Sequence, residues 1–452
     1  MADVAIVGGG WSGFAAAVTL ADAGLAVDVF EASDTLGGRA RRVAIDSMTV
    51  DNGQHLLLGA YRDTLALIER VHRDDRDDRH VDALYLRTPL RLAGPGRFSL
   101  RARNLPAPWH MVTALLFAGD CSIGERIAMV GAFSQWKADG WTAPSGATVA
   151  RLLARQPAKL IERIWSPLCL AALNTPIEEA SAQVYLNVLR DSLASDRAAS
   201  DLVIPLVDLS TLFPEAAASV VEAAGGTVRR GTRVRSIERI SGADEQANGS
   251  IARTSGPIAI HTGDAVHHAR AAIVATAPWQ AIALLERHGE AKRAIAQIRG
   301  YRYQPICTIY MRFDDPITLP FPMLQLGGGP GQWLFAPDAD ADLAQIVAVV
   351  ISAEGPYRTL ERDVLVRRVC AQLERNLPGW KAQPPIATQV IVERRATHAA
   401  TPGRAHPVAG RIGDRLYLAG DHTDPDYPAT LEAACRSGIR AAQSLLADRI
   451  AP

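Results

Sequence analysis

Four polar residues ahead of three leucines mark the first segment of this chain that could do chemistry. The segment 50–61 reads V-D-N-G-Q-H-L-L-L-G-A-Y and carries Asp51, Asn52, Gln54 and His55. Buried polar side chains need hydrogen-bonding partners, which a plain core segment would not supply. A plain surface loop would not carry three consecutive leucines. The pattern therefore predicts a polar ligand that lies against an apolar wall.

A glycine motif near the N-terminus predicts a dinucleotide site. Gly8, Gly10 and Gly13 form G-x-G-x-x-G after the apolar run D-V-A-I-V and at the start of an alanine-rich helix. These glycines permit a tight turn and let the backbone approach a pyrophosphate, whose charge the helix N-terminus favours. Glu31 ends the next predicted strand at the distance expected for a carboxylate that binds ribose hydroxyls.

A second motif follows at Gly37-Gly38-Arg39-Ala40. A double glycine with an arginine fork suits a second approach to a diphosphate, although the residues alone leave NAD and FAD open. The sequence has no second G-x-G-x-x-G and hence no dedicated NADPH domain. Electrons for a bound flavin would have to come from free NAD(P)H, another protein or the substrate.

With the G-G-R motif, the chain resembles the superfamily of flavin-containing amine oxidases and phytoene desaturases. L-Y-L-A-G-D-H-T-D-P-D-Y-P-A-T-L-E-A-A-C-R-S-G (416–438) is similar to the superfamily's A-G-D segment, and G-T-R-V-R-S-I-E to its adenine-binding strand. D-N-G-Q-H-L-L-L-G-A-Y-R-D-T, W-S-P-L-C-L-A-A-L-N-T (165–175) and R-R-A-T-H-A-A-T-P-G (394–403) resemble squalene-associated FAD-dependent desaturases of hopanoid synthesis. That group is now understood as hydroxysqualene dehydroxylases.

The resemblance implies an α/β fold, with a Rossmann-like FAD-binding domain of the GR2 type and an inserted α+β substrate domain. The predicted FAD domain comprises residues 1–90, 205–290 and 385–452, and the substrate domain comprises 91–204 and 291–384. The residues expected to bind FAD are Gly8, Gly10, Trp11, Ser12, Gly13, Glu31, Gly38, Arg39, Gly53, Gln54, His55, Val234, Gly420, Asp421, Thr430 and Leu431. No metal site is expected.

The implied activity is reductive removal of the hydroxyl from hydroxysqualene, giving squalene. An oxidative phytoene or carotenoid desaturase is the nearest alternative. An amine oxidase is disfavoured in part, because the C-terminal helix lacks the covalent flavin cysteine pattern. A fourth hypothesis is a non-enzymatic lipid carrier similar to the GDP dissociation inhibitors. The intact glycine motif, Glu31 and G-G-R argue against it.

His55 is the candidate catalytic residue, because an imidazole at the boundary between flavin and substrate could protonate a leaving hydroxyl. A purely hydrogen-bonding histidine is the alternative. His422, Asp424 and Asp426 could relay that proton, although capping of a helix is the simpler role for the acids. Aromatic residues stabilise a developing carbocation, and those expected to line the substrate cavity are Trp165, Tyr185, Trp279, Tyr303 and Trp333.

Composition limits the partners and the compartment. Lys+Arg and Asp+Glu both total 48, so no global field favours nucleic acid. Five scattered cysteines and no evident signal peptide predict a cytoplasmic protein. A C30 isoprenoid must be drawn from a bilayer, so peripheral membrane contact is expected. Segment 105–118, with Trp109 and Phe117, is the candidate docking surface, unless it packs inside the substrate domain.

Overall fold

The computed structural model describes residues 2–45, 48–73, 83–96, 98–241, 245–247, 250–252, 255–263, 265–315, 317, 319, 321, 323–336, 345–377 and 384–450. Most of the charged run 73–79, which the sequence predicts to be a loop, lies outside the described residues. So does part of the predicted hairpin connection at 241–250.

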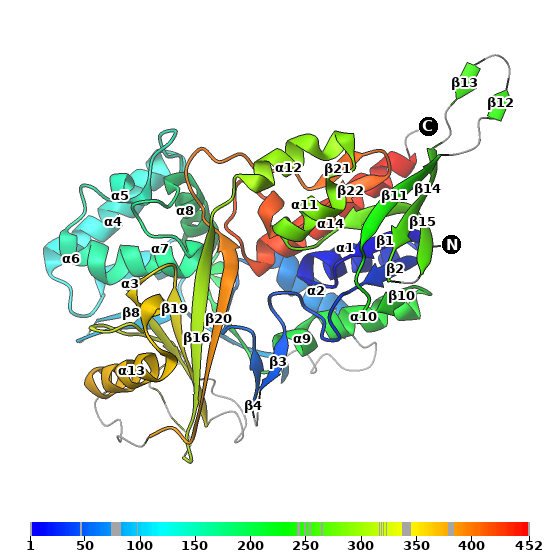
Figure 1. Ribbon diagram of the computed structural model, residues 1–452. Helices are drawn as coiled ribbons and strands as arrows, with labels where there is room; N and C mark the ends of the chain where they lie inside the picture. The colour runs from blue at the N-terminus through cyan, green and yellow to red at the C-terminus, as the bar shows by residue number, and fades with distance from the viewer. Residues whose placement is uncertain are drawn as a thin grey trace.

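An eight-stranded sheet forms the core of the larger unit, on the right of Figure 1. Its main path is β10-β2-β1-β15-β14-β11, with β22 beside β15 and β21 beside β22. The strands are β1 (Ala2–Val7), β2 (Val27–Phe30), β10 (Thr227–Arg229), β11 (Ser236–Ser241), β14 (Ser255–His261), β15 (Val266–Val274), β21 (Gly410–Gly413) and β22 (Leu416–Leu418). The β1–β2, β2–β10, β1–β15 and β15–β22 pairs are parallel, which confirms the expected Rossmann-like arrangement.

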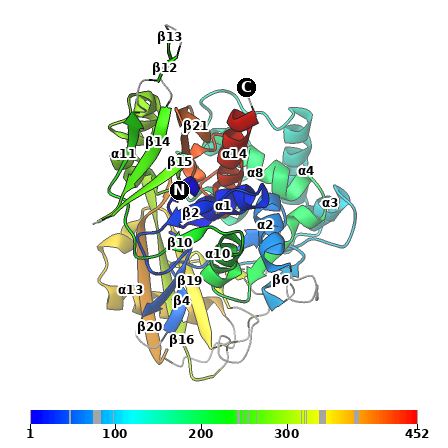
Figure 2. The same cartoon turned by 90° about the vertical axis from the view of Figure 1, so that its right-hand side faces the viewer.

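Helices cover both faces of this sheet because successive residues of β1 point to opposite sides. Val4 and Ile6 pack with α1 (Trp11–Asp22), α10 (Pro214–Ala223) and α14 (Leu431–Ile450). Ala5 and Val7 pack with α11 (Pro278–Leu285) and α12 (Lys292–Arg299) on the other side. Figure 2 shows α1 beside α14, with α10 next to α1.

A second, antiparallel sheet has the order β17-β18-β19-β16-β20. Its strands are β17 (Met323–Gln325), β18 (Trp333–Phe335), β19 (Ile346–Ser352), β16 (Tyr303–Arg312) and β20 (Ala387–His398), and α13 (Arg362–Asn376) packs on one face. The sequence M-L-Q-L-G-G-G-P-G-Q-W-L-F at 323–335 predicts a hairpin with a glycine-rich turn, and the β17–β18 pair confirms it. The long strands β16 and β20 run side by side through the middle of the molecule (Figure 1).

Two of the predicted domain boundaries differ from those in the structure, because of the pairing of β20 and the packing of α12. Strand β20 lies within the range assigned to the FAD domain, yet it pairs with β16 in the second sheet. Helix α12 lies within the range assigned to the substrate domain, yet Ala294, Ile295 and Ile298 pack in the core of the first sheet. The chain therefore changes units near residues 300 and 398 instead of 290 and 385.

The third group is mainly helical and lies on the left of Figure 1. Its helices are α3 (Trp109–Leu116), α4 (Ile123–Ala138), α5 (Val149–Leu152), α6 (Ala158–Leu160), α7 (Ser166–Leu173) and α8 (Ala182–Leu189). Residues 105–200 have helical periodicity in the sequence, and these helices confirm the prediction that follows from it. The remaining elements are β3 (Arg42–Ile45), β4 (Met48–Asp51), β5 (Leu57–Leu58), α2 (Arg62–His72), β6 (Tyr85–Thr88), β7 (Arg91–Ala93), β8 (Ser99–Arg101), β9 (Leu202–Pro205), α9 (Leu209–Leu212), β12 (Glu245–Ala247) and β13 (Ser250–Ala252).

Candidate active site

One cavity of ≈ 880 Å³ joins the three groups of elements. Its polar end is lined by the glycine loop after β1, by Glu31 and by Arg39. Its apolar end lies among the helices and is lined by Leu92, Leu100, Met111, Leu115, Phe133, Ile164, Trp165, Leu168, Leu189, Met323 and Trp333. Residues 52–56 connect the ends, because Asn52 bonds to the Arg39 carbonyl while Leu56 packs with the apolar cluster.

Two glycines of the loop have different physical roles. A Cβ on Gly13 would lie 1.9 Å from the Gly8 carbonyl oxygen, so this glycine lets α1 pack against the loop. A Cβ on Gly10 would meet nothing closer than 3.8 Å, and Gly10 lines the cavity. The missing side chain at Gly10 therefore leaves room for a ligand, as a pyrophosphate at the N-terminus of α1 requires.

Glu31 holds the loop from the end of β2. Its Oε2 accepts a hydrogen bond from the Gly9 amide at 2.7 Å, and its Oε1 accepts one from the Ser33 amide at 2.8 Å. The carboxylate also lines the cavity. It is thus oriented by backbone donors and placed where the sequence predicts a ribose-binding acid.

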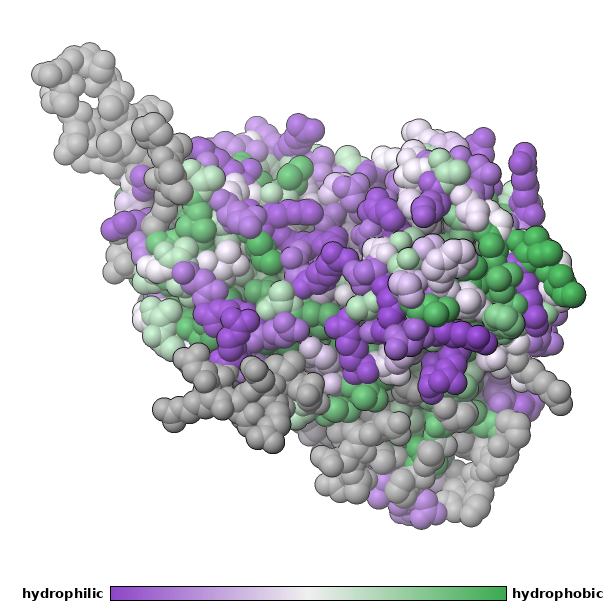
Figure 3. All heavy atoms as spheres, turned by 180° about the vertical axis from the view of Figure 1, so that it is seen from behind, coloured by the Kyte–Doolittle hydropathy of each residue, from purple (hydrophilic) through white to green (hydrophobic). Residues whose placement is uncertain are grey.

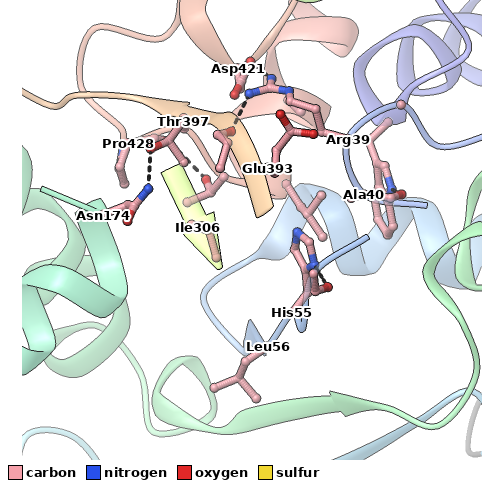
Figure 4. A pocket seen from close by; sticks show the side chains of 18 of the residues that line it. Arg39, Ala40, His55, Leu56, Asn174, Ile306, Glu393, Thr397, Asp421 and Pro428 are labelled. Atoms are coloured by element: carbon pink, nitrogen blue, oxygen red, sulfur yellow. Dashed lines mark hydrogen bonds and ion pairs between the residues drawn. The ribbon is translucent and has the colours of Figure 1, made fainter. Parts of the chain in front are cut away.

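Arg39 and Asp421 form an ion pair on the wall of the polar end, seen in Figure 4. Arg39 Nη2 lies 2.6 Å from Asp421 Oδ1, and Arg39 Nη1 donates to the Ala396 carbonyl at 2.7 Å. Although burial opposes ionisation, Arg39 holds the pKa of the Asp421 carboxyl well below its usual range. The aspartate therefore stays an anion and fixes the guanidinium beside the cavity.

His55 enters the cavity from the segment after β4 (Figure 4). Its Nδ1 lies 2.7 Å from the Gly53 carbonyl oxygen, which can only accept, so Nδ1 carries the hydrogen in the neutral ring. The lone pair of the neutral ring is then on Nε2. Burial lowers the pKa of His55, with a further lowering by the charge of Arg39, so the neutral form dominates at pH 7.

Sequence comparison gives the family. Residues 11–446 match the family described as flavin containing amine oxidoreductase. The chain belongs to this family. It is accordingly an FAD-dependent oxidoreductase, and the glycine loop, Glu31 and the Arg39–Asp421 pair fit the diphosphate and ribose of that cofactor.

Several known proteins are similar to the chain over nearly its whole length. A hydroxysqualene dehydroxylase from Rhodopseudomonas palustris is 30% identical, covering 98% of each chain. One from Sinorhizobium fredii is 29% identical over 99% of each. A 15-cis-phytoene desaturase from Synechococcus elongatus is more distant, at 24% identity over 98% of this chain and 96% of its own. A putrescine oxidase variant shares the fold, with a TM-score of 0.70, 15% identity and 99% of each chain covered.

Of the residues expected to bind FAD in this flavoprotein, Gly13 does not line the cavity and the others do. Trp11 is fixed there because its Nε1 donates to the Ala40 carbonyl at 3.0 Å. Four of the five expected aromatic residues, Trp165, Tyr185, Trp279 and Trp333, also line it. Tyr303 does not, since it packs edge-on against the Trp279 ring at 5.3 Å between centroids.

None of the residues of the predicted proton relay, His422, Asp424 and Asp426, lines the cavity. His422 is 0% exposed, lies outside the cavity wall and has no hydrogen bond to either ring nitrogen within the described residues. Asp424 is bound by Arg440 at 3.2 Å, and Asp426 is exposed. The expected capping of α14 by these acids is wrong, because the Thr430 hydroxyl accepts from the Ala433 amide instead.

Sequence reasoning missed the contribution of β20 to this flavoprotein's site. Glu393 lines the cavity near Arg39, and its Oε2 accepts from Asn52 Nδ2 at 3.3 Å. Thr397, also on β20, accepts from Asn174 Nδ2 at 2.9 Å (Figure 4). Asn174 Oδ1 accepts from the Ala353 amide. The signal available was the resemblance of 165–175 and 394–403 to the dehydroxylases, which marks these segments without assigning their side chains a role.

Proposed function

We propose that this flavoenzyme removes the hydroxyl of hydroxysqualene reductively and releases squalene. The observation that carries the proposal is the single cavity, whose dinucleotide end continues into a long apolar end. A C30 isoprenoid needs an apolar chamber of this kind, with few polar groups to fix its orientation. The hydroxysqualene dehydroxylases matched over nearly the full chain support the same substrate class.

Reductive dehydroxylation has three requirements that the protein must meet. An allylic carbon–oxygen bond ionises once its hydroxyl is protonated, and bound FAD in its reduced state supplies the hydride. The chain must therefore hold the substrate, exclude water and provide a proton. Leu56, Leu58 and the aromatic walls exclude water, whereas Leu57 packs in the core of the first sheet. His55 donates the proton from Nε2 when the ring is charged.

Product analysis tests this function. Holoenzyme reduced under anaerobic conditions is incubated with hydroxysqualene and, separately, oxidised holoenzyme is incubated with phytoene. Squalene should form from the first, with one deuterium at the former carbinol carbon when the reductant is supplied in deuterated buffer. Oxidised holoenzyme that instead gives phytoene a new conjugated double bond would favour the desaturase reading and overturn the dehydroxylase.

We also propose that α3 and the start of α4 rest on a membrane surface. No helix within the described residues has the length and apolar character to span a bilayer. Helix α3 instead has two apolar faces: Met111 and Leu115 line the cavity, while Trp109 is 60% exposed. The outer face continues through further exposed apolar side chains, namely Leu105, Leu116, Phe117, Ile123 and Ile127. Figure 3 shows hydrophobic residues gathered at this edge of the molecule.

Such a surface lets a water-insoluble substrate pass from lipid to the adjacent cavity. In liposome flotation, Trp109→Glu/Phe117→Glu should lose most binding relative to wild type. Ile386→Glu/Val408→Glu is the matched control, because those side chains are 50% and 73% exposed outside this surface. Equal flotation of the two double variants would exclude the α3 surface.

A further inference from the structure

Within the described part of the chain, one buried phenol in the cavity has no hydrogen-bonding partner. Tyr427 is 3% exposed and lines the cavity, yet its hydroxyl makes no hydrogen bond to any described residue. Other buried side-chain nitrogen and oxygen atoms also lack partners in the described part of the chain, but they belong to residues that do not line this cavity. Buried hydroxyls are normally paired, so this one calls for a ligand.

The position of Tyr427 is fixed from several sides. The Arg436 guanidinium lies 4.5 Å from its ring centroid, and Arg436 Nε is held by Glu432 at 3.0 Å. Glu432 in turn accepts from the Thr64 hydroxyl at 2.8 Å. Asn187 Nδ2 donates to the carbonyl of the preceding residue at 2.9 Å. The phenol is therefore pre-organised by α14, α2 and α8.

The environment suits a hydrogen-bond donor. The ring belongs to the apolar cluster that surrounds the hydrophobic end of the cavity. Burial raises the pKa of Tyr427 above its ordinary value, and nearby Tyr61 raises it further, so the hydroxyl stays protonated. Tyr185 provides a contrast: it also lines the cavity, but its hydroxyl already donates to the Trp165 carbonyl at 3.2 Å.

We propose that Tyr427 is the specificity-determining residue that donates a hydrogen bond to the substrate hydroxyl. This inference rests on the proposed function, in which substrate and product differ by that hydroxyl alone. The alcohol satisfies the phenol, whereas the hydrocarbon product leaves it unpaired. Tyr427 thereby favours binding of hydroxysqualene and release of squalene, while His55 supplies the proton.

A competition experiment tests the assignment without turnover. Oxidised holoenzyme, which lacks the electrons for the reaction, is equilibrated with equal amounts of hydroxysqualene and squalene in detergent micelles. The protein is re-isolated, and the bound ligands are extracted and measured by gas chromatography. Wild type should retain hydroxysqualene over squalene by roughly tenfold, as expected for one hydrogen bond in an apolar site.

Tyr427→Phe should bring that ratio close to one while FAD content stays as in wild type. Tyr185→Phe is the matched control: it removes an internal bond, so it should weaken both ligands alike and keep the ratio. The inference is overturned if the wild-type ratio is near one, if the preference for hydroxysqualene survives in Tyr427→Phe, or if Tyr427→Phe loses FAD. Failure of the reduced wild type to make squalene would instead refute the proposed function.

Discussion

Replacing His55 with alanine gives the most direct test of how the proton is supplied. The His55 pKa is lowered from its ordinary value of 6.5, so the charged ring that can donate from Nε2 is a minority above that pH. The charged fraction then falls tenfold for each pH unit, and the wild-type rate should fall roughly 100-fold between pH 6.5 and 8.5 if the charged ring is the acid. Loss of a general acid should cost roughly 10²–10⁴-fold at the lower pH.

The assay is a single turnover. Reduced holoenzyme is mixed anaerobically with saturating hydroxysqualene in micelles, and flavin reoxidation is followed by absorbance across this pH range. His55→Ala should retain FAD, react slowly and show a flat profile. His72→Ala is the control, because this histidine bonds to the Leu212 carbonyl away from the cavity. A wild-type rate that does not change with pH, or a variant within threefold of wild type, would refute the reasoning.

Three further predictions concern the cofactor and stability. Gly10→Val should fold but lose FAD, whereas Gly13→Val should fail to fold because its Cβ would overlap a backbone oxygen; equal FAD content in soluble samples of both would contradict this. Glu31→Ala should deplete FAD, measured as the 450-nm to 280-nm absorbance ratio after gel filtration, by roughly tenfold or more. Burial raises the Asp51 pKa to about 7, so the folded state keeps a proton that the unfolded chain releases near pH 4, and stability should fall as pH rises between these values. Asp51→Asn should abolish that decline, which is worth up to about 2.7 kcal/mol over the two pH units from 5 to 7, in urea unfolding at pH 5 and 8.

The parts of the fold that sequence could predict are those whose signals lie close together in the chain. The β1–α1–β2 unit carries its strand, glycine turn, helix and acid within residues 2–31. The two-strand hairpin at 323–335 is likewise local. The partner of β20 was not predictable in this way, because its short apolar run at 390–392 would pair equally well with any strand of matching length. That pairing moved the domain boundary and brought Glu393 into the site.

Within the site, the spacing of the motifs located the right segments but did not show which of their side chains face the cavity. Asp421 and His422 are neighbours in one motif, yet Asp421 faces the cavity and His422 packs beneath it, where the Tyr301 hydroxyl donates to its carbonyl at 2.7 Å. The direction in which a side chain points from a short turn depends on the local backbone geometry, which the motif does not encode. Tyr427 was missed for a related reason: only the three-dimensional structure shows that its hydroxyl has no hydrogen-bonding partner among the described residues.

The protonation state of His55 also separates the two reactions that this cavity could serve. A reductive dehydroxylation needs a donor, so it uses the charged ring and slows as the pH rises. An oxidative desaturation must remove a proton from the carbon next to the hydride donor, so it would use the neutral ring, whose free lone pair is on Nε2 because Nδ1–H binds the Gly53 carbonyl. Because both reactions would use His55, the rate of reduction should fall and the rate of oxidation should rise as the pH rises. A rate of phytoene oxidation that rises with pH below 6.5 and levels off above it, with no squalene formed from hydroxysqualene, would assign this flavoprotein to the oxidative direction. A falling rate of hydroxysqualene reduction assigns it to the reductive one.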